Sequence, residues 1–471
     1  MMLRLLKHGR TPAGRLSRRW MSSGSHSKTT VLSFGDGSHG ALGLRSSIIG
    51  MGSDAYEPTP IPGLPPDVVT VAAGHFHSLA VTSEGHVWAW GRNNEGQLGR
   101  DPLSPRETWN EPKRVEGLNK VRVQAAFASG VISAAIGDDG SLWVWGSSKR
   151  GQLGLGQGIT NAALPSKIET LSGEEIVKVS LGWGHALALA KNGNLFGWGY
   201  YADGRIGKIG RELEISPLES NGTKLGSRGE SSAFEAAEKL VMEAIEKEKD
   251  MPIIWEPGSI EELHELKVAD VACGLDHSLV LCRDGTLFSG GSNVYGQLGR
   301  AIEYLGMQPV NINFLPLSIA SGLGNSLAVC NNPSSEPTGN ATSVVSWGWN
   351  KSSQLGREGP DNIPQVVEGL VGESPVSVSG GRAHSLALTA KKELWAWGCG
   401  RNGRLGLGSS ADETEPMLVE YLEGSEVIQA VAGLVWYKDP ANGDRCYDPT
   451  KTSASSEDPS RQVDELLDNS I

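Results

Sequence analysis

The sequence predicts an all-β protein of the β-propeller class, built from a tandem repeat. Leu-Gly or Ile-Gly endings recur at nearly constant spacing, and short runs of β-forming residues alternate with Asp-Gly and Asn-Gly turns. Glycine and tryptophan are abundant, with 62 and 14 copies among 471 residues. A repeat of about 50 residues made of short strands and tight turns is typical of propeller blades and unlike a helical bundle.

The N-terminal segment has the composition of an organelle transit peptide. The first 35 residues contain no Asp or Glu, and they carry seven Lys and Arg residues among several serines. Basic, serine-bearing and acid-free leaders direct import into mitochondria or chloroplasts. We therefore interpret residues 1–28 as a transit segment, with a processing point near Met21. The predicted location is the mitochondrial matrix, with chloroplast and nucleus as alternatives.

The repeat is defined by its glycine endings. They fall at Gly43, Gly99, Gly154, Gly207, Gly299, Gly356 and Gly406, at intervals of 56, 55, 53, 92, 57 and 50 residues. Only one interval departs strongly from the period, and it contains an insertion. The spacing therefore predicts one propeller domain over residues 29–437 rather than several unrelated domains.

Each copy contains two strand signals joined by a turn. In the best copy, a Gly-x-x-His-Ser strand runs to Val81, Glu84-Gly85 forms the turn, and Trp88-Ala89-Trp90-Gly91 forms the next strand. Such a glycine supplies the positive φ that we expect in a two-residue hairpin turn. The two tryptophans share one strand face, so we expect them to pack between sheets. The predicted structural residues of all copies are His77, Trp88, Trp90, Trp143, Trp145, His185, Trp198, His277, Trp347, His384, Trp395 and Trp397.

The tandem pattern resembles the regulator of chromosome condensation repeat family. The resemblance covers about residues 31–433 and rests on Gly-x-x-His-Ser-x-Ala-Leu, Trp-x-Trp-Gly and Gly-Gln-Leu-Gly occurring together. It implies a seven-bladed propeller with four-stranded blades. Because the chain begins in the middle of a repeat, it also implies that an N-terminal strand near Val31 completes the last blade.

The long interval predicts a helical insertion within residues 208–265. Apolar residues at helical spacing and a capping-box pattern indicate one amphipathic helix over about residues 233–249. This helix could cover the propeller rim or dock a partner. Its exposed positions are rich in glutamate.

The C-terminal end departs from the repeat. Gly433 arrives on schedule, but Trp436-Tyr437-Lys438-Asp439-Pro440 stands where a His-Ser strand is due. Proline argues against a central strand. One blade should therefore lack a proper strand, through imperfect closure or an isoform with an altered end. Residues 438–471 are polar without repeats, so we expect a disordered tail.

Composition and motifs exclude several classes of function. The net charge of −12 disfavours direct binding of RNA or DNA, which needs clustered basic residues. The chain has no apolar run of the ~18 residues that a membrane span needs. Its five cysteines lack the spacing of a zinc site. No catalytic array, phosphate loop or metal motif is discernible, so we expect no enzyme activity, no cofactor and no metal.

Propellers bind partners through loops at their faces. The residues between Gly and His of each copy should line one rim, either as a protein-binding surface or as ordinary partly buried residues around the channel. The candidate partner-binding residues are His75, Phe76, Trp183, Leu275, Asp276, Leu323 and Arg382.

The resemblance implies three functions to weigh. Together with the leader, it favours a mitochondrial scaffold that supports organelle RNA processing: intron splicing of complex I subunit transcripts, and so complex I biogenesis. Its partners would be splicing or ribosome-assembly proteins, with RNA bound indirectly. Guanine nucleotide exchange on a small GTPase is the alternative, but only Gly274-Leu275-Asp276-His277 matches the acidic loops that it needs. Ultraviolet-B photoreception is disfavoured because only Trp183 matches its tryptophan-bearing loops.

Overall fold

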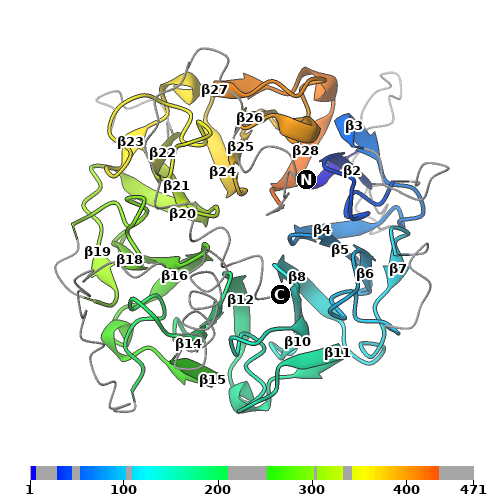
Figure 1. Ribbon diagram of the computed structural model, residues 1–471, viewed down its shortest axis with the longest axis vertical. Helices are drawn as coiled ribbons and strands as arrows, with labels where there is room; N and C mark the ends of the chain where they lie inside the picture. The colour runs from blue at the N-terminus through cyan, green and yellow to red at the C-terminus, as the bar shows by residue number, and fades with distance from the viewer. Residues whose placement is uncertain are drawn as a thin grey trace, which may run out of the picture. The chain divides into compact units, whose positions relative to one another are not determined.

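The computed structural model describes residues 2–6, 29–44, 54–101, 109–210, 252–301, 305–331 and 342–433. These residues form seven four-stranded antiparallel sheets that follow one another around a ring (Figure 1). The predicted all-β propeller class is therefore confirmed. The predicted helix over 233–249 and the C-terminal tail over 438–471 lie outside the described residues.

Six of the sheets use four strands that are consecutive in the chain. The first three are β4 (Val68–Ala73), β5 (His77–Thr82), β6 (Val87–Gly91) and β7 (Lys113–Arg114); β8 (Val123–Ser129), β9 (Ile132–Gly137), β10 (Leu142–Ser147) and β11 (Asn161–Lys167); and β12 (Ile176–Leu181), β13 (His185–Ala190), β14 (Leu195–Tyr200) and β15 (Ile253–Ser259). The next three are β16 (Val268–Cys273), β17 (His277–Cys282), β18 (Leu287–Gly291) and β19 (Gln308–Pro309); β20 (Leu315–Ser321), β21 (Asn325–Asn331), β22 (Thr342–Gly348) and β23 (Gln365–Val366); and β24 (Pro375–Gly380), β25 (His384–Thr389), β26 (Leu394–Gly398) and β27 (Glu413–Leu418).

Short 3-10 helices follow or connect the outer strands. They are η2 (Glu169–Leu171), η3 (Glu261–Leu263), η4 (Glu368–Leu370), η5 (Arg401–Gly403) and η6 (Glu420–Leu422). Because β15 and η3 begin at Ile253 and Glu261, residues 253–263 of the predicted insertion belong to the propeller. The sequence did not reveal this boundary because outer strands carry no repeat motif.

The seventh sheet is assembled from both ends of the chain. Its order is β28-β1-β2-β3, with β28 (Glu426–Val431), β1 (Met2–Leu6), β2 (Thr29–Gly35) and β3 (Ala55–Pro60). Figure 1 shows the N-terminus between β28 and β2. Met2–Leu6, which belongs to the predicted transit segment, thus takes the place of the missing repeat strand. Composition alone cannot reveal this pairing because the leader carries no repeat motif.

The hydrophobic core lies between neighbouring sheets. One cluster joins Leu79 of β5 to Val123 of β8 and Trp145 of β10, and similar clusters join the other neighbours. Val427 of β28 packs with Leu386 of β25, and Val431 packs near Val71 of β4. Gln429 of β28 also accepts a hydrogen bond from the Val71 amide and donates one to the Val71 carbonyl, both at 3.1 Å. The seventh sheet therefore contacts both of its neighbours.

The predicted inter-sheet packing by tryptophan is observed. Trp90, Trp145, Trp198, Trp347 and Trp397 are fully buried. Each indole nitrogen donates a hydrogen bond of 2.7–3.0 Å to a carbonyl oxygen in the glycine-ended loop of the preceding sheet. The indole nitrogen is the only polar atom of the ring, and this bond gives it a partner. The rest of the ring is apolar and packs in the core. The first tryptophan of each pair, such as Trp143, is only half-buried.

The hairpin turns have three residues rather than the expected two. Between β9 and β10 the Gly137 amide donates to the Ser141 carbonyl, and the Gly140 amide donates to the Gly137 carbonyl. Gly140 has φ +75°, so the turn ends in a left-handed residue. Asp-Gly supplies this conformation in both turn lengths, and for that reason the dipeptide does not distinguish them.

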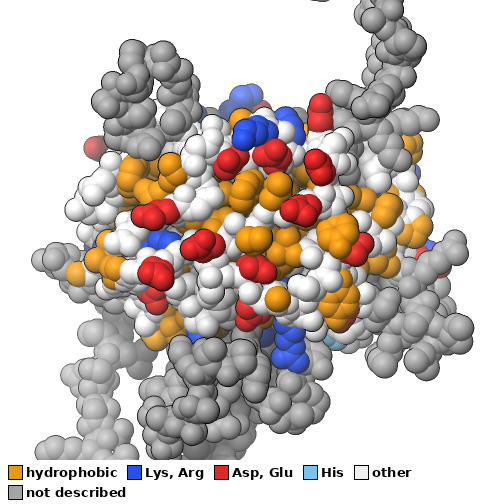
Figure 2. Space-filling model, turned by 90° about the horizontal axis from the view of Figure 1, so that it is seen from above, with side chains coloured by type: hydrophobic (Ala, Val, Ile, Leu, Met, Phe, Trp, Pro, Cys, Tyr) orange, Lys and Arg blue, Asp and Glu red, His pale blue; other side chains and the backbone are white. Residues whose placement is uncertain are grey.

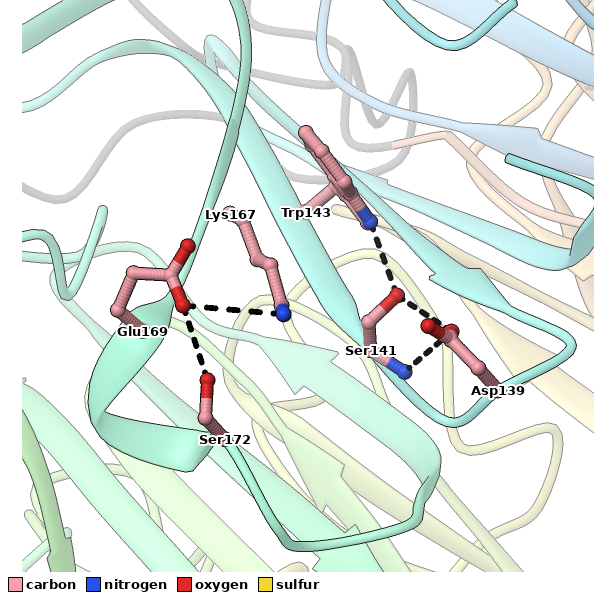
Figure 3. A network of polar contacts seen from close by, with 6 residues as sticks. All are labelled: Asp139, Ser141, Trp143, Lys167, Glu169 and Ser172. Atoms are coloured by element: carbon pink, nitrogen blue, oxygen red, sulfur yellow. Dashed lines mark hydrogen bonds and ion pairs between the residues drawn. The ribbon is translucent and has the colours of Figure 1, made fainter. Parts of the chain in front are cut away.

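Polar contacts support this turn on its outer side (Figure 3). The Asp139 carboxylate accepts hydrogen bonds from the Ser141 amide and hydroxyl at 2.9 and 2.6 Å. These bonds lower the pKa of Asp139 below its usual value. The Ser141 hydroxyl oxygen in turn accepts a bond of 3.0 Å from the Trp143 indole. Nearby, Glu169 pairs with Lys167 at 3.7 Å and accepts from Ser172 at 2.9 Å. The half-buried tryptophan is thus tied to the turn.

Candidate protein-binding face

The repeated histidines connect neighbouring sheets. The Nε2 atoms of His77, His185 and His277 lie 2.8, 2.8 and 3.0 Å from a serine hydroxyl of the next sheet, on Ser133, Ser278 and Ser326. Ser133 and Ser326 then donate to the same loop carbonyl that the tryptophan uses, on Gln97 and Gln297. These histidines are fully buried. Their geometry is that of a structural link, in agreement with the repeat analysis.

Between the second and third sheets, the histidine and the serine of this link are both replaced. Ile132 replaces the histidine of the second sheet, and Ala186 stands at the serine position of the third, where the two pack in one apolar cluster. Asn325 replaces a histidine and reaches Ser385 at 3.3 Å. An amide can therefore occupy the histidine position without losing the contact.

Burial of these histidines makes stability sensitive to acid. Burial lowers the pKa of His77 from 6.5 to about 3, so the folded chain keeps this ring neutral where the unfolded chain protonates it. Stability should fall as pH drops from about 6.5 to about 3, by ~1.4 kcal/mol per pH unit for each such group. We expect His77→Asn to keep the fold and to flatten this slope by that amount. Free energies of unfolding in denaturant between pH 7 and pH 4 measure it; parallel curves for the two proteins would contradict it.

The candidate rim residues fall into two groups. His75, Phe76, Leu323 and Arg382 are buried, whereas Trp183, Leu275 and Asp276 are partly exposed. Two of the buried residues bond to the loop of the next sheet: the His75 amide donates to the Gly130 carbonyl at 3.3 Å, and the Leu323 amide donates to the Gly381 carbonyl at 3.2 Å. The amides of Trp183 and Leu275 bond in the same way, to the Gly274 and Leu323 carbonyls, while their side chains stay partly exposed. Much of the predicted rim therefore holds neighbouring sheets together. A binding role stays a prediction for its partly exposed members.

His75 illustrates this internal role. Its ring packs edge-on against Trp183 of the third sheet, with centroids 4.7 Å apart, next to Gly130 of the second sheet. Burial, with Arg382 and His77 adding repulsion, lowers its pKa to about 3. The neighbouring Phe76 lies 4.5 Å from the His39 ring and 4.9 Å from the Arg92 guanidinium carbon.

A second set of loops extends the same face. In the six sheets of consecutive strands, the residue that follows the last glycine of the third strand donates its amide to the Gly-x-x-His loop or its counterpart. Ser292 donates to the Asp276 carbonyl at 3.0 Å, and Trp349 donates to the Gly324 carbonyl at 2.8 Å. These contacts place the two kinds of loop on one side of the ring. We call this side the loop face, and it comprises residues 74–77, 92–96, 182–185, 200–204, 274–277, 292–296, 322–325, 349–353 and 381–384.

The loop face contains an open groove whose lining includes two stacked aromatic rings. Tyr295 and Trp349 stack with centroids 5.3 Å apart, and Val294 beside them is 78% exposed. The groove has a volume of about 520 Å³ and is also lined by Asn350 and Asp361, which bond to each other at 3.2 Å. Its size is that of a ligand or side-chain pocket. Partly exposed tryptophan and tyrosine are the residue types that dominate protein–protein contacts.

Sequence reasoning missed this groove. Its signal was available: Tyr295 directly precedes Gly-Gln-Leu-Gly, where other copies have Glu95 or Arg150, and Trp349 directly follows Trp347-Gly348. Aromatic residues at loop positions that hold polar residues elsewhere in the repeat indicate a surface function.

Acidic groups accompany apolar ones on the outer surface. Figure 2, which views the molecule from above, shows acidic side chains interspersed with hydrophobic ones and few basic ones. On η4, β27 and η6, and at the residues that directly follow these two helices, the exposed residues include Val371, Met417, Tyr421, Glu368, Glu415, Glu420 and Glu423. This surface repels phosphate and suits a protein partner better than nucleic acid.

Among the described residues, no three His, Cys, Asp or Glu side chains are grouped to hold a metal ion. None of the helices in that part of the chain has the length and apolar character of a membrane span.

Comparisons with known proteins agree with this architecture. A family model described as RCC1-like domain matches residues 30–435. Ultraviolet-B receptor UVR8 of Arabidopsis thaliana is 27% identical over 399 residues, which cover 84% of this chain and 67% of that protein. Probable E3 ubiquitin-protein ligase HERC6 of Homo sapiens is 33% identical over 270 residues, 57% of this chain but only 22% of that protein. The structure of Saccharomyces cerevisiae Prp20p, described with its binding to Gsp1p and histones, has a TM-score of 0.65 at 22% identity and covers 93% of this chain and 94% of that one.

Proposed function

Because the chain belongs to the RCC1-like domain family, we propose that it is a non-enzymatic scaffold whose loop face binds proteins of mitochondrial RNA processing. The observation that carries the scaffold role is the groove lined by Tyr295 and Trp349. It offers stacked, partly exposed aromatic rings on a rigid face. The residues around it do not form a nucleophile, base and oxyanion arrangement of the kind that an enzyme needs.

The acid-free N-terminal segment supports a mitochondrial location for this scaffold. In the matrix its partners are splicing or ribosome-assembly factors, and its output is intron splicing of complex I subunit transcripts. RNA contact is indirect, because the net charge of −12 opposes phosphate binding. The seven sheets act as one closed seven-bladed ring, supported by the Gln429 contacts with Val71.

Proximity labelling in intact mitochondria tests this proposal. We expect the wild-type protein to label splicing or ribosome-assembly proteins. Trp349→Ala should weaken binding to the relevant partner ~30-fold, because hot-spot aromatics contribute about 2 kcal/mol or more. Tyr421→Ala is the matched control, since this 55% exposed ring lies on η6 and lines no part of the groove. Equal labelling by both variants, or labelling confined to another compartment, would contradict the proposal.

Nucleotide exchange is the second candidate function. One observation favours it: the Asp276 carboxylate is partly exposed on the loop face and is oriented by a 3.1 Å hydrogen bond from Gln297 Nε2. Prp20p, which shares the fold, is described as binding Gsp1p. Nucleotide release from organellar GTPases would decide between the functions. Fast release that is lost in Asp276→Ala, but kept in Asp284→Ala at the hairpin turn of the same sheet, would replace the scaffold proposal.

A further inference from the structure

The seventh sheet has a place for one strand that the repeat does not supply. In the other sheets the second strand from the centre is the fully buried His-Ser strand or its counterpart, as in β5, β9 and β13. In the seventh sheet β1 takes this place between β28 and β2. We call this place the strand slot.

The slot is bounded by two strand edges that accept a five-residue segment. Met2 to Leu6 pair antiparallel with Thr29 to Ser33 of β2 on one side and with Glu426 to Val431 of β28 on the other. The pairing with β2 is continuous, whereas the pairing with β28 shifts register between Arg4 and Leu5. A strand paired on both sides uses its backbone donors and acceptors alternately toward each neighbour.

The neighbouring sheet shows that this segment is a substitute. His384 of β25 is the counterpart of His77, His185 and His277, each of which reaches a serine in the next sheet. Neither ring nitrogen of His384 has a partner among the described residues, and its side chain is 5% exposed. Its serine would lie on the missing repeat strand. Met2–Leu6 thus supplies the backbone of the missing strand, but it does not supply the serine that would bond to His384.

We propose that the strand slot is a peptide-binding site whose occupant, Met2–Leu6 of this chain, is exchangeable. Its ligand is an extended apolar peptide of about five residues that pairs with β28 and β2 through main-chain hydrogen bonds. When a chain loses its leader, the edges of β28 and β2 become unpaired and available for such a strand. That this happens in the mature protein rests on the proposed mitochondrial import; the slot itself does not.

The tether explains why an intact chain resists exchange. Residues 7–28 connect β1 to β2, so the segment acts at an effective concentration of the order of millimolar. A free peptide must compete with that concentration. Cutting the connection turns Met2–Leu6 into an ordinary ligand that dilution removes. In one chain, Met2–Leu6 can therefore either be cleaved off with the leader or remain in the slot.

A cleavable full-length chain tests the slot in vitro. A specific protease site is placed within residues 7–28 and the intact protein is folded. One half of the sample is then cut at this site, and the other half is left uncut. A fluorescent peptide of residues 1–7 should bind the cut chain one to one and the uncut chain at least ~100-fold more weakly. The same peptide carrying Arg4→Pro should not bind measurably, because proline removes a ladder donor from a central strand. Equal binding to cut and uncut chains, or equal binding of both peptides, would overturn the proposal.

A second variant covers the case in which the cut chain aggregates. Full-length Arg4→Pro keeps its tether but should not fill its own slot, so its melting temperature should be lower than that of the wild type. Added wild-type peptide should raise it in a concentration-dependent way, as expected of a ligand that binds only the folded state. Absence of rescue at millimolar peptide would overturn the proposal. Neither experiment depends on mitochondrial partners, so their failure would leave the scaffold proposal standing.

Discussion

Trp145→Ala is expected to lower the free energy of unfolding by ~4 kcal/mol. The Trp145 ring is completely buried between the first two sheets, and its indole nitrogen donates a 2.9 Å hydrogen bond to the Gln97 carbonyl. The substitution leaves a cavity and an unpaired carbonyl, and Trp-to-Ala changes in cores cost about 3–5 kcal/mol. Denaturant unfolding followed by circular dichroism measures the loss.

Trp143→Ala is the matched control on the same strand. This ring is half-buried at the edge of the same inter-sheet cluster, and its nitrogen donates a hydrogen bond of 3.0 Å to the Ser141 hydroxyl. We expect the free energy of unfolding to fall by about 1–2 kcal/mol. The Trp143 ring buries less apolar surface on folding than the Trp145 ring does, and the space left by its removal is open to solvent. Similar losses for the two variants would contradict the assignment of the second tryptophan as the main inter-sheet contact.

Gly91→Ala should cost about 3 kcal/mol or more, because the position combines strained backbone with a steric clash. Gly91 has φ +108°, and an added Cβ would lie 2.3 Å from the Phe76 carbonyl oxygen and 2.7 Å from the His77 Cα. Both obstacles are backbone atoms that hold the loop face, so relief requires the loop to move. Thermal and denaturant unfolding would register the loss.

Gly173→Ala separates the two contributions. Gly173 has a similar φ of +102° but nothing within 4 Å of an added Cβ. Its cost should be limited to backbone strain, about 1–2 kcal/mol. If Gly91→Ala costs no more than Gly173→Ala, then the close approach of the Gly-x-x-His loop is not rigid, and the loop face is not the preorganised surface described above.

The repeat motifs predicted the interior strands well, because each motif residue has an inter-sheet contact to make. Trp90 and His77 recur for that reason, and their burial follows from the repeat alone. Outer strands such as β15 escaped prediction because their residues are only partly buried, so these positions tolerate many residue types. The three-residue turns escaped because Gly140 satisfies two turn geometries.

The candidate site was predicted less well. His75 and Leu323 were expected on a surface rim, but their amides bond to the loops of the next sheet and their side chains are buried. The groove at Tyr295 and Trp349 depends on loops from two sheets meeting, which spacing within one repeat cannot show. Strand β1 is the extreme case, because its partners lie at opposite ends of the sequence.

Hydrogen exchange on the full-length chain tests the central claim that Met2–Leu6 completes the seventh sheet. Amides of β1, β2 and β28 pair with one another, so the account predicts that Leu3, Arg4 and Leu5 are protected to a degree similar to the amides of β2 and β28. Exchange of these amides at the rate of an unstructured peptide, while Leu79 in β5 stays protected, would contradict it.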